Sequence, residues 1–397
     1  MKHTILTAAG LIALAACASN DAEGPAPSPA PDGDGGAPLV DAGSIDPTTP
    51  DADADAAAER ALVCGEAGFC ETRIPTDERG LPASLQGVWV VAPNDVWSVS
   101  AEGSILHYDG TSWTTAHRDG HPLRSIWATA TSVWAGGEGG GLFHRGKTGQ
   151  WSRVETGRVG TVRSIYGTSD DDVWFAFSDE SVSHFDGTKL TNRTVDIPDL
   201  RITTVFGGSG SQVYAAGYVD SLTISEETGL FNYLPHVFEV SPTAIVPFNE
   251  YMPEIFPGFA PMSGAVIDAP GEERQLFLTG VGGMVEYKIS LYMTIDRENM
   301  TAFGGLGEGY DGFFFDSNGG PSPPPHLLSV PIWARAWDDI YVPTHVGGIY
   351  RWTGTELVGT SLKMGYGFVP RPTLGIHGSS NEAWLVGDGY ALKGPTL

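Results

Sequence analysis

The chain has 397 residues and a formal net charge of −26 at pH 7, with 48 acidic and 22 basic side chains. A field of that sign repels nucleic acids and anionic lipid surfaces, so we expect neither as a charge-driven partner. Gly accounts for 53 residues and Trp for 11, a composition typical of short strands joined by tight turns. The length exceeds that of one ordinary domain unless the fold is built from repeats.

The first residues have the features of an export signal. Lys2 and His3 form a short polar start, and the apolar run 5–13 is too short to span a bilayer. Residues 14–17 read Leu-Ala-Ala-Cys and resemble the lipobox of bacterial lipoprotein signal peptides. The resemblance implies cleavage before Cys17 and lipid attached to that residue. The alternative is an ordinary cleaved signal peptide.

The residue after the lipobox bears on the location. Lipid on Cys17 would be the only membrane contact of the chain, and several acyl chains anchor stably where one does not. Ala18 stands where an Asp would favour retention in the inner membrane of a Gram-negative bacterium. We therefore expect an exported protein at the outer membrane or cell surface.

Residues 18–60 are Ala, Asp, Pro, Gly, Ser and Thr with almost no large apolar side chain. Because burial cannot offset the entropy of ordering them, we expect a disordered linker. Residues 61–80 are expected to form an N-terminal latch. Within it, Cys64 and Cys70 predict a local disulfide, as is usual for such a close pair in an exported chain. A metal site would need more ligands than this segment offers.

A four-part pattern recurs from residue 81 to residue 397. Each unit begins with an apolar strand that ends in a large residue, as in residues 87–89 and 125–127. A second strand follows and carries one conspicuous bulky residue. These second-strand aromatics are Trp97, Trp134, Trp174, Tyr214, Phe277, Tyr341 and Trp384.

A third strand follows a turn rich in Gly, Ser or Asp, and in the early units a fourth begins at a bulky residue. The fourth-strand markers are Trp113, Trp151, Leu190 and Phe231. Four short strands with a period of about 39 residues indicate an all-β fold, a single β-propeller of about seven four-stranded blades. Because neighbouring blades bury each other's faces, we expect the second-strand aromatics to pack between blades.

The last unit ends at Leu397 without a fourth strand, which leaves an open sheet edge. The segment 69–76, which precedes the first unit, is the natural donor of that strand. We therefore expect closure of the ring by an N-terminal strand, with the bridge between Cys64 and Cys70 stiffening its entry.

Two segments of the first unit resemble known repeats. Residues 95–97 read Asp-Val-Trp, and residues 107–113 read His-Tyr-Asp-Gly-Thr-Ser-Trp. They are similar to the Trp-rich propeller repeats in exported proteins of myxobacteria and their relatives. The Asp-Gly-Thr-Ser-Trp piece is also similar to the Asp-box of sialidases, although the leading Ser of that box is absent. These resemblances imply a fold and no particular activity.

Two spacings exceed the period, one between Phe206 and Ile267 and one between Ile267 and Trp333. We expect each extra stretch to follow an outer strand, so strand parity would bring both to the same face of the propeller. Exposed aromatic and acidic side chains there suit a protein or a sugar ligand. The ligand-binding candidates are Glu250, Tyr251, Glu254, Phe256, Tyr310, Asp311, Phe313, Phe314, Asp316 and Asn318. Alternatively, these loops cover the channel mouth or each other.

Three histidines follow their second-strand aromatics at one constant interval, namely His107, His144 and His184. Equivalent positions in successive blades lie ~10 Å or more apart, whereas zinc needs its ligands ~2 Å from the ion. We interpret these histidines as repeat positions. The sequence predicts no metal site and no cofactor.

The segment 73–75, Arg-Ile-Pro, is the sharpest indication of an enzyme. It resembles the Arg-Ile-Pro segment of sialidases, whose arginine binds the substrate carboxylate. Those enzymes also need two further arginines, a Tyr–Glu pair and an Asp, which the spacing here does not identify. The same residues fit the latch strand equally well, and we assign no catalytic residue.

Three hypotheses for the function follow. The first is a non-catalytic binding or scaffold lipoprotein for a protein or an extracellular polymer such as a polysaccharide. The second is a glycan-acting hydrolase or lyase on the same ring, which a carboxylate-plus-arginine cluster in the central channel would favour. The third is an assembly component whose loops only meet a partner subunit. A channel lined by small and apolar residues would favour binding over catalysis.

Overall fold

The computed structural model describes most of the chain after residue 61. The described residues are 62–77, 79–208, 212–224, 231–248, 259–267, 275–283, 288–295, 331–336, 338–343, 347–353, 357–365, 367–368 and 372–397. Cys17 and the linker 18–60 lie outside them. No helix in the described ranges is long and apolar enough to cross a membrane.

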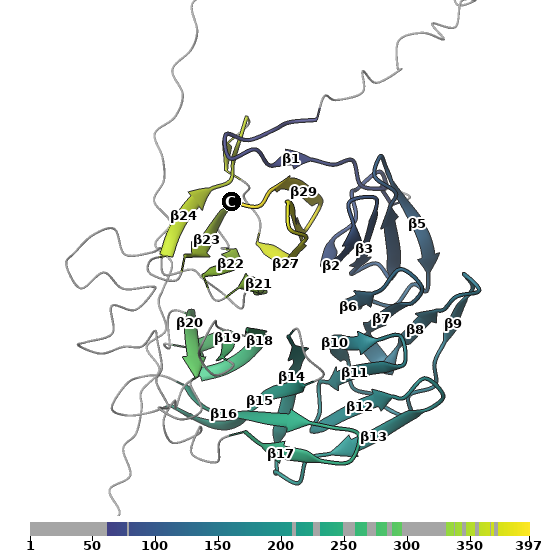
Figure 1. The fold of residues 1–397 in the computed structure, drawn as a ribbon, viewed down its shortest axis with the longest axis vertical. Coiled ribbons are helices and arrows are strands. Elements are labelled where there is room, and N and C mark those ends of the chain that lie inside the picture. Colours follow the sequence, from purple (N-terminus) through teal and green to yellow (C-terminus); the bar gives the residue numbers. More distant parts are fainter. Residues whose placement is uncertain are drawn as a thin grey trace, which may run out of the picture. The chain divides into compact units, whose positions relative to one another are not determined.

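Short antiparallel sheets stand around a central axis as the blades of a propeller (Figure 1). Blade 1 contains β2 (Leu85–Ala92), β3 (Asp95–Ser100), β4 (Ser104–Tyr108) and β5 (Trp113–Arg118). Blade 2 contains β6 (Leu123–Ala128), β7 (Val133–Gly137), the 3-10 helix η1 (Glu138–Gly140), β8 (Leu142–Arg145) and β9 (Trp151–Arg153). Blade 3 contains β10 (Val162–Ser169), β11 (Asp172–Phe177), β12 (Ser181–Phe185) and β13 (Leu190–Thr194).

The second half of the ring is less regular. Blade 4 contains β14 (Leu200–Gly207), β15 (Val213–Ile224), β16 (Phe231–Val240) and β17 (Ile245–Pro247). A three-stranded sheet of β18 (Phe259–Ile267), β19 (Gln275–Gly283) and β20 (Lys288–Ile295) follows. Blade 5 contains β21 (Trp333–Ala336), β22 (Asp339–Pro343), β23 (Gly348–Trp352) and β24 (Leu357–Ser361), and a small hairpin of β25 (Lys363–Met364) and β26 (Gly367–Phe368) comes after it. Blade 6 joins β27 (Thr373–Gly378), β28 (Glu382–Gly387) and β29 (Tyr390–Pro395) to β1 (Cys70–Glu71).

The structure confirms an all-β propeller and corrects its number of four-stranded blades. Six sheets within the described residues have four strands, where the repeat pattern predicted about seven. Apart from the two-stranded hairpin of β25 and β26, the other described sheet has three strands, and its inner strand β18 contacts β14 of blade 4 and β21 of blade 5. The residues 296–330 that follow β20 lie outside the described part. The sequence after Phe277 carries no fourth-strand marker, so the pattern could not fix the strand number there.

Blade 4 also departs from the prediction. Phe231 begins β16, which pairs with β15 as the third strand, and the fourth strand is β17. The second and third strands of this blade have 12 and 10 residues, compared with 6 and 5 for β3 and β4. Much of the extra length between Phe206 and Ile267 therefore lengthens this hairpin instead of forming one insertion after the outer strand.

Burial is greatest on the second strands and falls toward the fourth. Five of the six residues of β3 are buried, whereas β5 is mostly exposed. The seven second-strand aromatics are all 4% exposed or less, which confirms their position in the core. Trp134 meets Phe175 of the next blade edge-on, with ring centroids 5.1 Å apart, and Trp384 meets Tyr108 across the seam of the ring at 4.8 Å. These rings form contacts between neighbouring blades.

An acid–aromatic–base stack recurs on the second and third strands. In blade 1, Asp95 accepts hydrogen bonds from Trp97 Nε1 at 2.7 Å and His107 Nε2 at 2.9 Å, and the two rings stack. Equivalent sets are Asp172, Trp174 and His184; Asp339, Tyr341 and Arg351; and Glu382, Trp384 and Lys393. Blade 2 has Ser132 in place of the acid, and the buried indole N–H of Trp134 has no partner.

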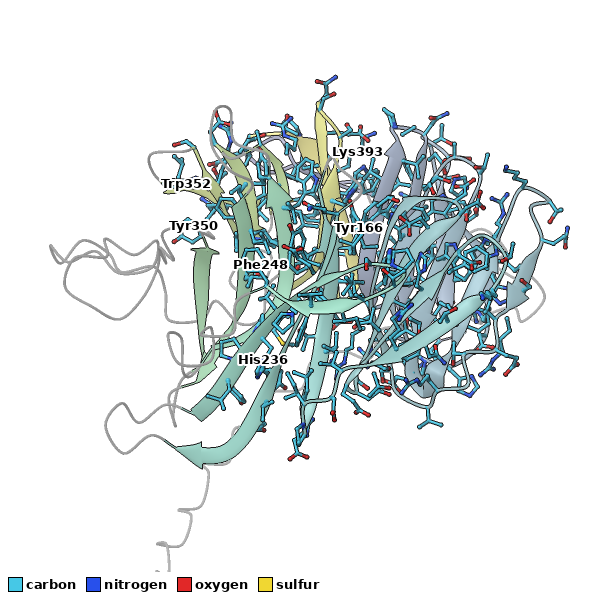
Figure 2. The ribbon with its side chains drawn as sticks, turned by 60° about the horizontal axis from the view of Figure 1, so that its bottom comes forward. Tyr166, His236, Phe248, Tyr350, Trp352 and Lys393 are labelled. Atoms are coloured by element: carbon cyan, nitrogen blue, oxygen red, sulfur yellow. A yellow bond between two sulfur atoms is a disulfide. The ribbon has the colours of Figure 1, made fainter. Side chains whose placement is uncertain are left out.

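Neighbouring inner strands are locked by aromatic rings that lie on glycines. A Cβ atom on Gly167 would fall 2.5 Å from Cζ2 of Trp127 in the preceding blade, and one on Gly207 would fall 2.4 Å from Cε1 of Tyr166. The Tyr166 hydroxyl also donates to the carbonyl of Gly208 at 3.0 Å. Only glycine leaves room for this approach. Tyr166 is labelled in Figure 2, near the middle of the ring.

The first described segment closes the ring, as the sequence predicted. Strand β1 pairs antiparallel with β29, with Cys70 opposite Lys393 and Glu71 opposite Leu392. Phe69, directly before β1, is 1% exposed and packs in the core of blades 5 and 6. The C-terminal blade thus receives its fourth strand from the N-terminal side, which removes the open edge.

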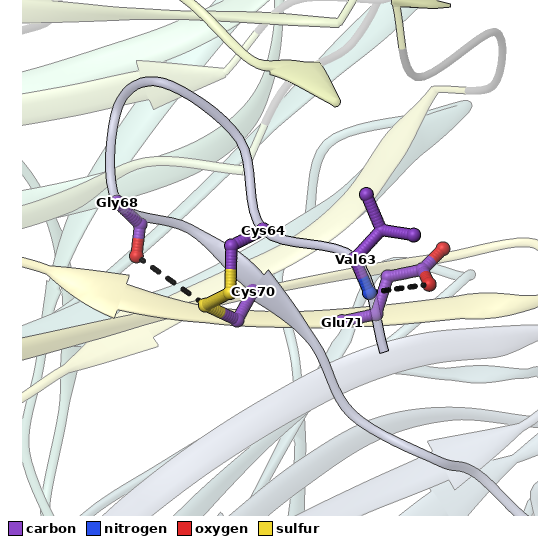
Figure 3. Close-up of a disulfide and its surroundings, with 5 residues drawn as sticks. All are labelled: Val63, Cys64, Gly68, Cys70 and Glu71. Atoms are coloured by element: carbon purple, nitrogen blue, oxygen red, sulfur yellow. Dashed lines mark hydrogen bonds between the residues drawn. A yellow bond between two sulfur atoms is a disulfide. The ribbon is translucent and has the colours of Figure 1, made fainter. Parts of the chain in front are cut away.

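The predicted disulfide between Cys64 and Cys70 is present and sits at the entry to this strand (Figure 3). Backbone bonds between residues 63 and 71 form a small hairpin around it, and the Glu71 carboxylate accepts a hydrogen bond from the Val63 N–H. Gly65 packs against the backbone of Lys363, which joins the hairpin to β25. The latch is therefore fixed on both of its sides.

Candidate functional site at the central channel

The two ends of the ring carry different connections. At one end, the inner strands begin and the second strands turn into the third. Arg124, near the start of β6, bonds Glu138 in the β7–β8 connection at 2.8 Å. Arg158, between blades 2 and 3, lies 3.5 Å from Asp179 in the β11–β12 connection. These contacts confirm that both kinds of connection share one face.

Six of the described inner strands carry a β-bulge close to this end. Each bulge leaves one residue without a cross-strand partner and turns its side chain away from the regular alternation. The bulge residues are Gln86, Arg124, Arg163, Thr203, Met262 and Leu374. All six line one cavity of about 410 Å³, together with Glu138 and Thr161. We call this end the bulge face and the cavity the bulge-face mouth.

Two arginines stand in the bulge-face mouth, and their partners differ. Arg124 donates to Gln86 Oε1 at 2.7 Å and to Glu138 Oε1 at 2.8 Å. Arg163 is exposed and has no hydrogen bond or ion pair with any described residue. It lines both the mouth and the central channel. An accessible cation therefore stands at the axis of a strongly acidic chain.

The central channel has a volume of about 590 Å³ and is lined by the inner strands. Most of its lining is small or apolar, as at Gly87 and Val205. Its charged residues are Arg163 and Arg335, and Arg335 is paired with Asp339. No carboxylate lines the channel in the described ranges. This lining matches the one that the sequence analysis associated with binding.

The opposite end, the acidic face, carries the Asp-rich turns. The Thr111 hydroxyl and the backbone N–H groups of Ser112 and Thr111 hold the pKa of Asp109 at about 2. Asp186 caps the equivalent turn of blade 3, where its pKa is also about 2, and Asp170 accepts from two threonine hydroxyls. These carboxylates are used by their own turns and their neighbours. Among the described residues, no group of three or more His, Cys, Asp or Glu is arranged to hold a metal ion.

The three repeat histidines lie in separate stacks. His107 and His184 bond the acids of their own blades, and His144 lies 3.0 Å from Ser132 Oγ. Each ring stacks on the second-strand tryptophan of its blade, at 4.0 to 4.2 Å between centroids. Burial lowers the pKa of His144, which keeps it neutral. The arrangement supports their interpretation as repeat positions.

The Arg73-Ile74-Pro75 segment lies at the outer edge of the ring. It lines a pocket of about 1010 Å³ between the latch and blade 1, and it does not line the central channel. There the Trp113 indole N–H donates to the Thr72 hydroxyl at 2.9 Å. The segment therefore belongs to the latch, and the sialidase-like reading has no support from its position.

The ten ligand-binding candidates of the two long spacings fall in 249–258 and 296–330, outside the described residues. They stay predictions. The bulge residues, by contrast, were missed although the sequence carries their trace. Buried residues in a strand normally alternate, whereas Leu85 and Val88 are three positions apart, as are Leu123 and Ile126. A step of three inside an alternating strand is the mark of a bulge.

Comparison with known proteins shows the fold and not a family. No family model and no curated protein matches the chain. The solved structure of YCF48 bound to D1 peptide is similar, with a TM-score of 0.56 and 13% identity over 83% of this chain and 97% of that one. The structure of the WD40 repeats of RRP9 has a TM-score of 0.56 and 12% identity, over 85% of this chain and 100% of that one. The structure of a catalytically inactive virginiamycin B lyase from Staphylococcus aureus with quinupristin has a TM-score of 0.56 and 13% identity, over 83% of this chain and 99% of that one.

Proposed function

We propose that this chain is a protein-binding scaffold that holds a partner polypeptide on its bulge face. The observation that carries the proposal is the bulge-face mouth, where six neighbouring inner strands direct their extra side chains into one cavity. Residues mounted on rigid strands position a ligand more tightly than residues on loops. A repeated bulge at one edge is a way to re-aim side chains toward a ligand.

Three further features support this function. The mouth contains Arg124, Arg163 and Met262, residue types that are enriched at protein interfaces. The channel has no described carboxylate that could act as a general acid or base beside an arginine. One similar propeller, YCF48, is solved with a bound peptide. Together they favour a peptide ligand over a glycan substrate.

The test compares two ligand classes under the same conditions. The purified full chain is applied to a random peptide array and to a glycan array that includes sialosides, neutral glycans and cell-wall fragments. We expect sequence-selective peptide binding above the background of an unrelated propeller, and no glycan binding. Binding to one glycan class alone, or release of sugar from a sialoside, would contradict the proposal.

We further propose that lipid on Cys17 and the linker 18–60 hold the propeller at an outer membrane or cell surface. The lipobox resemblance and the composition of the linker support this location. Metabolic labelling with palmitate should mark the wild-type chain, while Cys17→Ser should abolish the label. A variant with both Cys64 and Cys70 changed to Ser should keep it. Equal labelling of the Cys17→Ser chain would refute the anchor.

A further inference from the structure

The bulge-face mouth indicates which group a partner places there. We propose that Arg163 binds a carboxylate of the partner polypeptide, either its C-terminal carboxylate or an Asp or Glu side chain. The inference rests on the proposed protein-binding function and adds the chemistry of the contact.

The two arginines of the mouth have separate tasks. The Arg124 guanidinium is already held by the Gln86 amide oxygen and the Glu138 carboxylate, at 2.7 and 2.8 Å. Glu138 is the one acid that lines the mouth among the described residues, and this contact neutralises it. Arg163 has no hydrogen bond or ion pair with any described residue, so its positive charge is not neutralised by them.

The backbone under Arg163 is fixed while its side chain is exposed. The preceding residue, Val162, is fully buried, and the following residue, Ser164, donates its hydroxyl to the Val205 carbonyl of the next blade at 3.0 Å. The bulge places Arg163 between these two anchors. A planar guanidinium on a rigid strand is suited to two parallel hydrogen bonds with a carboxylate.

The position of Arg163 gives access from both directions. It lines the mouth and also the channel, and in the described part it is the only charged residue that lines both cavities; the uncharged Leu374 lines both as well. A polypeptide end or an acidic side chain that enters from the bulge face meets this guanidinium before the apolar channel wall. Methionine and leucine on the far side, Met262 and Leu374, provide apolar contact for the groups next to the carboxylate.

The charge of the whole chain sharpens the selectivity. With a net charge of −26, most of the surface repels an acidic segment. The unpaired Arg163 guanidinium stabilises a carboxylate of the partner at one place on this surface. We therefore expect the contact to fix the position of the partner in the mouth more than it raises the association rate.

The test uses peptides in three matched forms. Each sequence of a random decapeptide library is made with a free C-terminal acid, with a C-terminal amide, and as an amide with Asp and Glu replaced by Asn and Gln. Binding to the full chain is measured for wild type, Arg163→Gln, Arg163→Lys and the control Arg118→Gln. Arg118 is an exposed arginine on the outer strand β5, so the control removes an equal charge away from the mouth.

For the best binders, we expect the uncharged form to bind about tenfold more weakly, equivalent to about 1.4 kcal/mol. The amide arm identifies a terminal carboxylate, and the Asn/Gln arm identifies a side chain. Arg163→Gln should remove the difference between forms, Arg163→Lys should keep part of it, and Arg118→Gln should keep all of it.

Two results overturn the inference in distinguishable ways. If peptides bind but the three forms bind equally, or Arg163→Gln preserves their difference, the carboxylate contact is wrong and the protein-binding function stands. If no peptide binds in any form, the proposed function fails together with the inference. Circular dichroism and thermal melting of each variant confirm that a lost difference does not come from unfolding.

Discussion

At the scale of single residues, the blades are held by a small polar device inside an apolar core. An acid at the start of the second strand accepts a hydrogen bond from the indole N–H of the tryptophan two positions later, and it pairs with the base that stacks on this ring from the third strand. In blade 5, where the aromatic is Tyr341, its hydroxyl donates to the Leu397 carbonyl instead. Each polar atom of the stack is satisfied, which removes the cost of burying it. Blade 2 lacks the acid and has Ser132 at this position. The Ser132 hydroxyl forms a hydrogen bond with His144, and the Trp134 indole N–H has no partner.

Ser132→Asn should therefore stabilise the protein. An amide oxygen at this position can accept the Trp134 N–H that now lacks a partner, and it adds no charge beside Asp170. Satisfying one buried donor contributes about 1 kcal/mol. Chemical denaturation should show this gain for Ser132→Asn, and Ser132→Ala should lose stability. A lower midpoint for the Asn variant than for wild type would show that the pocket has no room for the amide.

A pH effect belongs to His377 on the inner strand β27. Burial lowers its pKa from 6.5 to about 3. Its Nδ1 accepts the Val90 N–H of blade 1 at 3.0 Å, and its ring stacks on Trp89, so the folded state needs the neutral imidazole. Because the unfolded state binds the proton more readily, the stability contribution is complete above pH 6.5 and is lost as the pH falls below it.

The matched variant for this effect is His377→Asn, whose side-chain oxygen accepts the same N–H and does not titrate. Between about pH 7 and pH 4.5, the wild-type melting temperature should fall more steeply than that of the variant. Other carboxylates and histidines contribute equally to both proteins, so their difference isolates His377. Parallel curves would mean that His377 is solvated when the protein is folded.

At the scale of elements, the inner strands do two things. Their aromatic ends lie on glycines of the next blade, which sets the distance between blades. Their bulges, near the opposite ends, direct side chains into the bulge-face mouth. The same strand therefore carries the packing and the candidate site, and a change in one shifts the other.

Gly207→Ala tests the packing. Its Cβ would lie 2.4 Å from Tyr166 Cε1, so the ring must move and about 2 kcal/mol of stability should be lost. Gly87→Ala is the control, because a Cβ at that inner-strand glycine meets nothing closer than 3.4 Å. The midpoint of urea unfolding should fall for Gly207→Ala and change little for Gly87→Ala. An equal fall of the midpoint in both variants would show that the contact with the Tyr166 ring does not decide the outcome.

The sequence predicted most of the architecture because the repeat is visible in large residues. The aromatics such as Trp97 and the open edge at Leu397 were enough to place the second strands and the closing strand. The assignment of Phe231 to a fourth strand was wrong, because the hairpin of blade 4 is longer than in the other blades and Phe231 lies at the start of its third strand. The mouth was missed because it is made of dissimilar residues, from Arg124 to Leu374, which share only a backbone irregularity.

At the scale of the whole molecule, the two faces of the ring differ in what their charges do. On the acidic face, Asp109 and Asp186 accept hydrogen bonds from their own turns, so these acids are committed to the fold. On the bulge face, the Arg163 guanidinium makes no hydrogen bond or ion pair with any described residue. A strongly acidic chain thus keeps one unpaired guanidinium at its axis among the described residues, and we infer that partners approach from the bulge face.

The most direct measurement is site-specific photo-crosslinking in the cells that make the protein. A photoreactive amino acid is placed at Leu374 on the bulge face or at Thr188 on the acidic face, and adducts are identified by mass spectrometry. The proposed function predicts a discrete protein adduct from Leu374 that Arg163→Gln weakens, and none from Thr188. Adducts from Thr188 alone, or no protein adduct from either position, would contradict a protein-binding bulge face.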